Sequence, residues 1–237
     1  MNTPNGVIRI ISKSGRPFAD RKEAGSLLAK ELEGYSGPET VVLGIPRGGL
    51  VVAEAIACAL NADLDIVISR KLRAPGDPEY AVGAVNENGG VFIEGAFSKA
   101  GGGLDDYIAK EKEYQLKEIK RRAELFRGIR PRAGLKNKNV IIVDDGLATG
   151  STMHAAIRSA RLEGPGKIIA AVPVSPEDTI AKISAIADET VCLRVPSDFY
   201  GVGQFYSDFT QVEDADVLEI LRSARRWNGA DKKHGNH

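Results

Sequence analysis

The sequence predicts an α/β protein in which a parallel sheet is flanked by helices and residues 1–237 form a single domain. Three observations predict this class. Short apolar or β-branched runs alternate with segments of helical periodicity, which is the pattern of strands joined by crossover helices. The run at 139–145 is apolar until it ends in two acids, as expected of a buried parallel strand that leads to a binding site. Hydrophobic residues make up 43% of the chain and charged residues 27%, which is ordinary for a globular protein.

The expected elements follow one another along the chain. The expected strands are 40–45, 64–69, 139–145, 167–174 and 190–195, and the expected helices are 21–35, 50–60, 104–127, 151–163, 177–187 and 214–225. Asp20 stands where it would cap the first helix, and the apolar residues that follow it recur at helical spacing. Residues 74–79 (APGDPE) have the composition of a turn, and AVGAV and GVFIE around NENGG predict a β-hairpin.

Charge and targeting signals exclude several classes of protein. Lys+Arg and Asp+Glu number 32 each, so the chain has no net positive field for nucleic acid or for an anionic membrane. No apolar run approaches the length of a bilayer-spanning helix, and the first residues do not have the pattern of a signal peptide. Cys58 and Cys192 fall in apolar segments and are expected to be small buried side chains rather than a disulfide. We therefore expect a cytoplasmic protein with no nucleic-acid partner and no membrane partner.

The segment VIIVDDGLATGST, residues 140–152, carries the most specific signal. Asp144 and Asp145 stand at the carboxyl end of the expected strand, which is the edge where open α/β sheets bind ligands. Gly146 and Gly150 allow the backbone of the following turn to come close to a ligand. The segment therefore predicts a site in which two carboxylates lie beside a glycine-containing turn.

The start of the helix after this turn offers a phosphate cradle. Its backbone N–H groups have no acceptor within the helix, and the hydroxyls of Thr149, Ser151 and Thr152 stand beside them. Carboxylates accept hydrogen bonds, and the 2′,3′-diol of a ribose presents two donors. A phosphate cradle beside two carboxylates predicts a ribose 5-phosphate site.

Residues 140–152 resemble the phosphoribosyl-diphosphate-binding motif of the type I phosphoribosyltransferases: an apolar strand, an acidic pair, small residues and T-G-x-T. The resemblance implies that Asp144 and Asp145 are the catalytic pair, which holds the ribose hydroxyls and stabilises the cationic sugar. It implies that Ala148 to Thr152, Gly150 included, hold the 5-phosphate. It also implies the fold of that family, with a hairpin and a C-terminal hood over the sheet.

GIPRGGLVVAEAIA, residues 44–57, resembles the pyrophosphate-binding loop of the same family. Gly48 and Gly49 allow backbone amides to approach the diphosphate. Arg47 can donate to two phosphate oxygens at once. The resemblance therefore implies that these three residues bind the substrate.

A third segment, SRKLRAPGDPEYAVGAV, places Arg70 and Lys71, with Arg73 after them, at the end of the strand expected over 64–69. That position is again the carboxyl edge of the sheet, so Arg70 and Lys71 are expected to be a second cationic contact to the diphosphate. The stretch 38–155 as a whole resembles a set of bacterial predicted phosphoribosyltransferases without an established acceptor.

The resemblance implies transfer of the 5-phosphoribosyl group from phosphoribosyl diphosphate to a nitrogenous, nucleobase-like acceptor, with release of diphosphate. Mg²⁺ would be carried with the diphosphate, and no side chain is expected to be a metal ligand. Ala148 stands where hypoxanthine-guanine enzymes commonly carry an acid, which argues against a purine role that depends on that acid. Two other functions stay open: a non-catalytic regulator that senses phosphoribosyl diphosphate, and a sugar-phosphate hydrolase or phosphorylase that uses the same site.

The family resemblance assigns the core to residues 38–175 and the hood to residues 176–225 with the N-terminal segment. The aromatic residues of 199–209 either stack on a planar acceptor or pack the hood on the core, which we favour. The tail, residues 229–237, is expected to be disordered.

The end of helix 104–127 and the segment after it are strongly basic. The residues concerned are Lys120, Arg121, Arg122, Arg127, Arg130 and Arg132. They either fold over the diphosphate, contact the second subunit of a homo-oligomer, or form a solvated face, which is the interpretation we favour.

Overall fold

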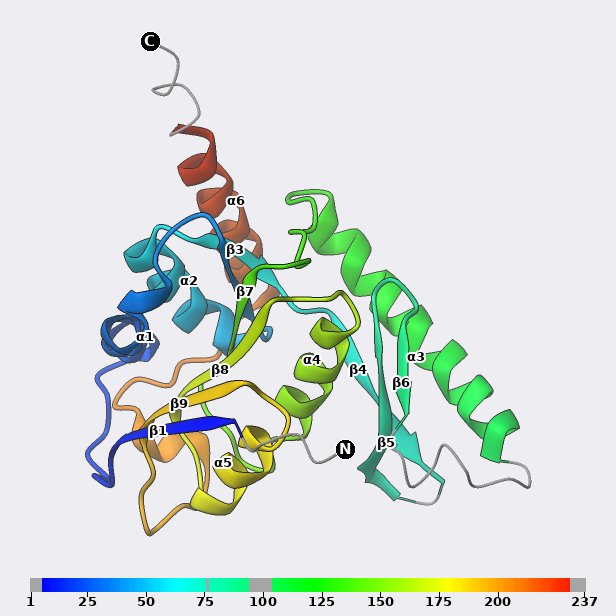
Figure 1. Cartoon of the computed structure of the whole chain (residues 1–237), viewed down its shortest axis with the longest axis horizontal. Coiled ribbons are helices and arrows are strands. Elements are labelled where there is room, and N and C mark those ends of the chain that lie inside the picture. The colour runs from blue at the N-terminus through cyan, green and yellow to red at the C-terminus, as the bar shows by residue number, and fades with distance from the viewer. Residues whose placement is uncertain (1–5, 76, 94–103, 231–237) are drawn as a thin grey trace.

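The computed structural model describes residues 6–75, 77–93 and 104–230 of the chain. The strands are β1 (Val7–Ser12), β2 (Thr40–Gly44), β3 (Asp63–Ile66), β4 (Ser69–Ala74), β5 (Asp77–Asn86), β6 (Val91–Ile93), β7 (Asn139–Val143), β8 (Lys167–Val174) and β9 (Glu189–Arg194). The α-helices are α1 (Arg21–Glu31), α2 (Gly48–Leu60), α3 (Leu104–Arg127), α4 (Ser151–Arg161), α5 (Glu177–Ser184) and α6 (Asp214–Ala230). Within these residues the strands form a parallel sheet in the order β1-β9-β8-β7-β2-β3 and an antiparallel sheet in the order β4-β5-β6 (Figure 1).

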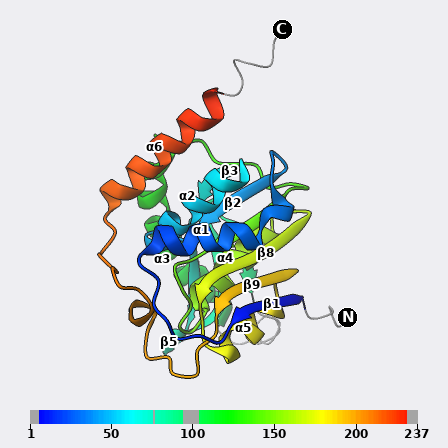
Figure 2. The same ribbon diagram turned by 90° about the vertical axis from the view of Figure 1, so that its left-hand side faces the viewer.

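The parallel sheet is covered on both faces, as its apolar strands predict. Helices α1, α2 and α6 lie on one face and α4 and α5 on the other (Figures 1 and 2). Strand β7 contributes to both hydrophobic clusters because successive side chains of a strand point to opposite faces. Ile141 and Val143 pack with the helices of the first face, and Val140 and Ile142 pack on α4.

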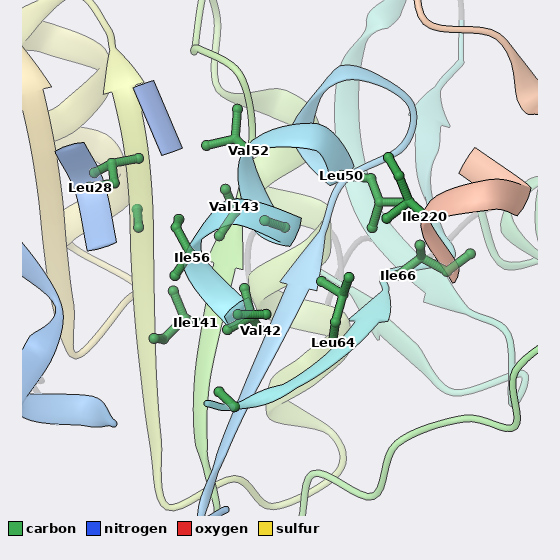
Figure 3. Close-up of a cluster of buried hydrophobic side chains, with 14 of the residues drawn as sticks. Leu28, Val42, Leu50, Val52, Ile56, Leu64, Ile66, Ile141, Val143 and Ile220 are labelled. Carbon is green, nitrogen blue, oxygen red and sulfur yellow. The ribbon is translucent and has the colours of Figure 1, made fainter. Parts of the chain in front are cut away.

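The cluster on the first face fixes where α2 lies. Leu50, Val52 and Ile56 of α2 face Val42 and Val143 of the sheet (Figure 3). Helix α6 adds Ile220 to the same cluster. These contacts place the start of α2, and the turn before it, directly above the carboxyl end of β2.

The strand order creates a crevice between β2 and β7. The two strands are hydrogen-bonded neighbours, with Gly44 opposite Val143. Helix α2 follows β2 onto one face, whereas α4 follows β7 onto the other. Adjacent strands whose helices leave in opposite directions open a crevice at their carboxyl ends, which is where ligands bind in α/β sheets.

The parallel sheet and most of its helices agree with the sequence prediction. Asp20 caps α1 as expected, because its Oδ1 accepts a hydrogen bond of 2.8 Å from the backbone N–H of Glu23. Strand β1 was not predicted from the sequence. It pairs with β9 at the edge of the sheet, and Val7 and Ile8 stay 59% and 43% exposed. The segment VIRIIS is rich in β-branched residues, so the sequence did carry a strand signal here that the prediction passed over.

The second sheet corrects two expectations. β3 ends at Ile66 rather than at residue 69, so Arg70 and Lys71 lie within β4 instead of at the end of a parallel strand. β5 begins at Asp77, so the turn expected over 74–79 is shorter than predicted. The composition of 74–79 is that of a turn, but pairing between β4 and β5 extends the ladder into it. The hairpin around NENGG is confirmed by the antiparallel pairing of β5 and β6.

Helix α3 packs on the antiparallel sheet through its apolar side, with Ile119 and Phe126 buried (Figure 1). Lys120 and Arg121 are exposed, as the favoured solvated face requires, but Arg127, Arg130 and Arg132 are not part of such a face. The guanidinium of Arg127 lies 2.6 Å from Asp65 and 2.8 Å from Glu87. Arg130 pairs with Asp63, and Arg132 pairs with Glu87 at 2.6 Å. Acids from β3 and the hairpin reach the helix end in space, which the sequence of the helix alone does not reveal.

The two cysteines differ in exposure. Cys192 is buried as expected, but Cys58 is exposed, because it lies on the side of α2 that faces away from the sheet.

Helix α6 continues to Ala230, so the first two residues of the expected disordered tail are helical, and 231–237 lie outside the described residues. No helix in the described part of the chain is long and apolar enough to cross a membrane.

Candidate functional site

The turn from β7 into α4 forms one half of the candidate site. Gly150 caps α4 with a positive φ of 76°, a conformation that glycine adopts without strain. The hydroxyls of Thr149 and Ser151 lie 3.1 Å apart at the helix start, and Ala148 and Thr149 are exposed. The first N–H groups of the helix and these hydroxyls therefore face outward, as an anion site requires.

The turn from β2 into α2 forms the other half and lies directly against the acidic pair. A Cβ on Gly48 would collide with the carboxylate Oδ2 of Asp145 and stand 2.9 Å from Arg21 Nε. A Cβ on Gly49 would stand 2.8 Å from Asp144 Cα. Both glycines are therefore needed for the two turns to meet. The structure thus brings together the PRGG segment and the acidic pair, which lie about a hundred residues apart in the sequence.

The two acids lie in different surroundings. Asp145 Oδ2 accepts a hydrogen bond of 2.8 Å from Arg21 Nε, and the side chains of this ion pair are only 16% and 10% exposed. Asp144 Oδ1 accepts a hydrogen bond of 2.9 Å from the backbone N–H of Asp145. Burial and then the charge of Asp145 raise the pKa of Asp144 well above its usual value. A cation or a hydrogen-bond donor placed beside Asp144 would relieve this cost.

Arg21 is the residue that sequence reasoning missed. Its Nη1 donates a hydrogen bond of 2.8 Å to the carbonyl oxygen of Thr210, and its guanidinium lies 3.9 Å from the ring centroid of Phe209. Tyr206 donates a hydrogen bond of 2.6 Å from its hydroxyl to the backbone oxygen of Asp145. Arg21 is separated from Asp145 by 124 residues, and it stands in an ordinary amphipathic helix, so no local signal marks it.

A pocket of about 510 Å³ opens beside the β7–α4 turn, within the roughly 300–1,000 Å³ typical of small-molecule sites. Thr149, Ser151 and Thr152 line one side of it, and Pro46 belongs to the β2–α2 turn. Four cationic residues complete the wall: Arg70, Lys71, Arg73 and Arg122. No carboxylate is among the described residues that line this pocket. Arg70 and Lys71 therefore reach the predicted edge although β4 belongs to a separate sheet.

Arg47 does not line this pocket. Its Nη1 lies 3.0 Å from Oε2 of Glu213, just before α6, and both side chains are largely exposed. An exposed ion pair of this kind contributes at most about 1 kcal/mol. Arg47 is therefore held only weakly and can turn from Glu213 to another anion.

The aromatic segment packs mainly against the core, as favoured. Phe205 and Tyr206 are buried, and Tyr206 lies against Phe18 with 5.5 Å between ring centroids. Phe199 stacks on Phe205 at 5.4 Å. Tyr200 and Phe209 are the exceptions, because they are 90% and 38% exposed. Among the residues that the structure describes, no group of three or more His, Cys, Asp or Glu side chains could hold a metal ion.

Comparison with known proteins identifies relatives over most of the chain. The family model of the phosphoribosyl transferase domain matches residues 19–210. Two Mycobacterium tuberculosis proteins, from strains CDC 1551 / Oshkosh and ATCC 25618 / H37Rv, are 44% identical over 213 residues, and both are named "Putative phosphoribosyl transferase". The match covers 88% of this chain and 47% of theirs, so the chain spans about half the length of these curated relatives.

A solved structure shares the fold at similar identity. The crystal structure of TT1426 from Thermus thermophilus superposes with a TM-score of 0.82 and 43% sequence identity. The match covers 87% of this chain and 98% of that one.

Replacement of Gly48 by alanine tests whether the two turns form one site. The new Cβ would collide with the Asp145 carboxylate, so we expect Gly48→Ala to weaken binding of phosphoribosyl diphosphate at least about tenfold in calorimetry. Gly134→Ala is the matched control, because a Cβ there meets no atom within 4 Å. Equal affinities for Gly48→Ala and Gly134→Ala would mean that the two turns do not share a ligand.

Proposed function

The chain belongs to the phosphoribosyltransferase family, and on that premise we propose that it transfers the 5-phosphoribosyl group of phosphoribosyl diphosphate to a nitrogenous acceptor and releases diphosphate. Its fold is that of the type I enzymes, with a parallel sheet flanked by helices. The observation that carries the proposal is the meeting of the PRGG turn, the acidic pair and the α4 N-terminus at one sheet edge. Each of these features suits a different part of the proposed substrate.

The sugar phosphate end of the substrate would bind at the β7–α4 turn. Residues 148–152 offer backbone amides and hydroxyls to the 5-phosphate. Asp144 and Asp145 would accept hydrogen bonds from the ribose hydroxyls. Arg21 holds Asp145 at this edge, so the carboxylate is oriented before the ligand arrives.

The diphosphate end would bind across the crevice. Arg47, Gly48 and Gly49 belong to the turn that meets the acids, and Arg70 and Lys71 line the adjoining pocket. Guanidinium groups bind phosphate oxygens well because they can donate two parallel hydrogen bonds. Fixed cations near the leaving group would stabilise the negative charge that develops on it during transfer.

The acidic pair would also act on the reacting carbon. Departure of diphosphate leaves positive charge on the ribose ring, and a nearby carboxylate stabilises that charge. Burial and then the charge of Asp145 raise the pKa of Asp144, and the positive charge on the sugar would favour the ionised carboxylate. The nitrogen of the acceptor would then attack C1 directly, with no covalent enzyme intermediate.

Mg²⁺ is the expected companion of the diphosphate, and the donor set is compatible with it. Mg²⁺ prefers oxygen ligands, keeps several waters, and is usually held by one or two carboxylates together with substrate phosphates. Arg21 is bonded to Asp145, and among the described residues no arginine forms an ion pair with Asp144, so the carboxylate of Asp144 is the side chain suited to lie beside the ion. When bound, Mg²⁺ would neutralise the charge of the leaving diphosphate.

The function is tested by incubation with Mg-phosphoribosyl diphosphate and a panel of nitrogenous acceptors, with mass detection of ribosylated products. We expect one class of acceptor to be ribosylated and diphosphate to be released in equal amount. The Asp144→Asn, Asp145→Asn double variant should lose this product, because charge-assisted hydrogen bonds contribute about 1.5–3 kcal/mol each. Release of phosphate without any acceptor would indicate a hydrolase. Tight binding without turnover across the panel would indicate a sensor.

Arg47 is proposed to hold the diphosphate rather than the sugar. Arg47→Ala should weaken phosphoribosyl diphosphate by about 2 kcal/mol, whereas ribose 5-phosphate, which lacks the diphosphate, should bind as before. Isothermal titration calorimetry with both ligands measures this difference.

Glu213→Gln is the control for the ion pair that Arg47 forms with Glu213 when no ligand is bound. It should leave the affinity for phosphoribosyl diphosphate unchanged or raise it slightly, because Arg47 no longer has to leave a carboxylate. If Arg47→Ala weakens both ligands equally, Arg47 supports the loop instead of contacting the diphosphate.

A further inference from the structure

The basic residues at the end of α3 and after it fall into two groups. Arg127, Arg130 and Arg132 all pair with acids of β3 and the hairpin, and the exposed Arg121 lies 3.7 Å from Glu118. Arg122 differs, because it is half-buried and forms no ion pair with the described residues, although the charges of Asp214 and Glu118 act on it from a greater distance. A partly dehydrated guanidinium without a directly paired carboxylate is costly unless a ligand supplies the opposite charge.

Arg70 of β4, like Arg122, forms no ion pair with the described residues. Its Nε donates a hydrogen bond of 2.9 Å to Oε1 of Gln115, which is a neutral group. Gln115 in turn donates a hydrogen bond of 2.8 Å from its Nε2 to Oε1 of Glu111. Glu111 is already paired with Arg73 at 2.6 Å. This buried chain of side chains fixes α3 to β4 and neutralises Arg73. It orients Arg70 but leaves its charge uncompensated.

Arg70 and Arg122 line the same pocket, opposite the hydroxyls of the β7–α4 turn. Burial, and after it the positive charge of Arg70, lower the pKa of Arg122. Two guanidinium groups that face one pocket repel each other in the free protein. An anion between them would remove the repulsion and gain hydrogen bonds to both.

The position of Arg122 indicates which anion this is. The 5-phosphate has its own cradle at residues 148–152. Pro46, which precedes Arg47 in the β2–α2 turn, lines the same pocket as Arg122. Arg122 therefore shares its pocket with the turn at which the diphosphate is proposed to bind.

We propose that Arg122 of α3, together with Arg70 of β4, binds the diphosphate of the donor, so that α3 forms a wall of the active site. The inference rests on the proposed function for the identity of the donor, but the anion contact itself does not require transfer. Helix α3 lies along the antiparallel sheet beside β4, outside the parallel sheet that carries the other site residues (Figure 1). The substrate would thus bridge the two sheets.

The test compares Arg122→Gln with Arg121→Gln, its exposed neighbour on the same helix, by calorimetry with inorganic diphosphate, Mg-phosphoribosyl diphosphate and ribose 5-phosphate. We expect Arg122→Gln to weaken the two diphosphate ligands about tenfold or more and ribose 5-phosphate by less than about twofold. Arg121→Gln should bind all three as the wild type does. Arg122→Lys keeps a charge but cannot donate two parallel hydrogen bonds, so its affinity for the diphosphate ligands should lie between that of the wild type and that of Arg122→Gln.

Thermal unfolding separates binding from packing. Removal of an uncompensated charge should leave the unfolding temperature of Arg122→Gln equal to or above that of the wild type, whereas a structural role would lower it. Unchanged affinity for both diphosphate ligands, or an equal loss for ribose 5-phosphate, would overturn the inference. If the wild type binds diphosphate through Arg122 but transfers no ribosyl group to any acceptor, the proposed function fails and this inference stands. If the wild type binds neither diphosphate ligand, both fail.

Discussion

The ion pair between Arg21 and Asp145 is the interaction on which the rest of the site depends. Strand β7 delivers two adjacent carboxylates to a buried edge, where their dehydration and mutual repulsion would be unfavourable without a cation. Arg21 provides that cation from α1 and is itself tied to Thr210 of the hood. Removal of one partner of such a buried pair typically costs about 3–5 kcal/mol. One carboxylate thus joins the first helix, the hood and both ligand-binding turns.

The distribution of charge in the site follows from this arrangement. The acids of the site lie at the end of β7, while Arg70, Lys71 and Arg73 of β4 and Arg122 of α3 line the pocket beside it. A ligand with a neutral diol between two anionic groups matches that distribution, because its hydroxyls can meet the carboxylates and its phosphates the cations and the helix start. In the free protein Glu213 gives Arg47 a carboxylate partner. The surface is therefore prepared for a highly charged ligand even though the whole chain has no net charge.

Features encoded by contiguous residues could be predicted from the sequence, whereas features that depend on distant residues could not. The apolar run of β7, its terminal acids and the glycines of both turns are local signals, and the structure brings them to one edge. Arg21 could not be found in this way, because its partner lies 124 residues away. The sequence also did not show whether the basic residues from 127 to 132 are solvated or paired with acids. Their pairing depends on where Asp63, Asp65 and Glu87 lie in the folded chain. β4 was misplaced because SRKLRA follows β3 so closely that a change of sheet leaves no mark in the composition.

A crystal structure of the chain with Mg²⁺ and phosphoribosyl diphosphate tests the central claim most directly. We expect the 5-phosphate against the backbone amides of residues 148–152, the ribose hydroxyls on Asp144 and Asp145, and the diphosphate on the side of Arg47, Arg70 and Arg122. A ligand bound elsewhere on the chain, or a 5-phosphate held away from the start of α4 with the acidic pair untouched, would contradict it.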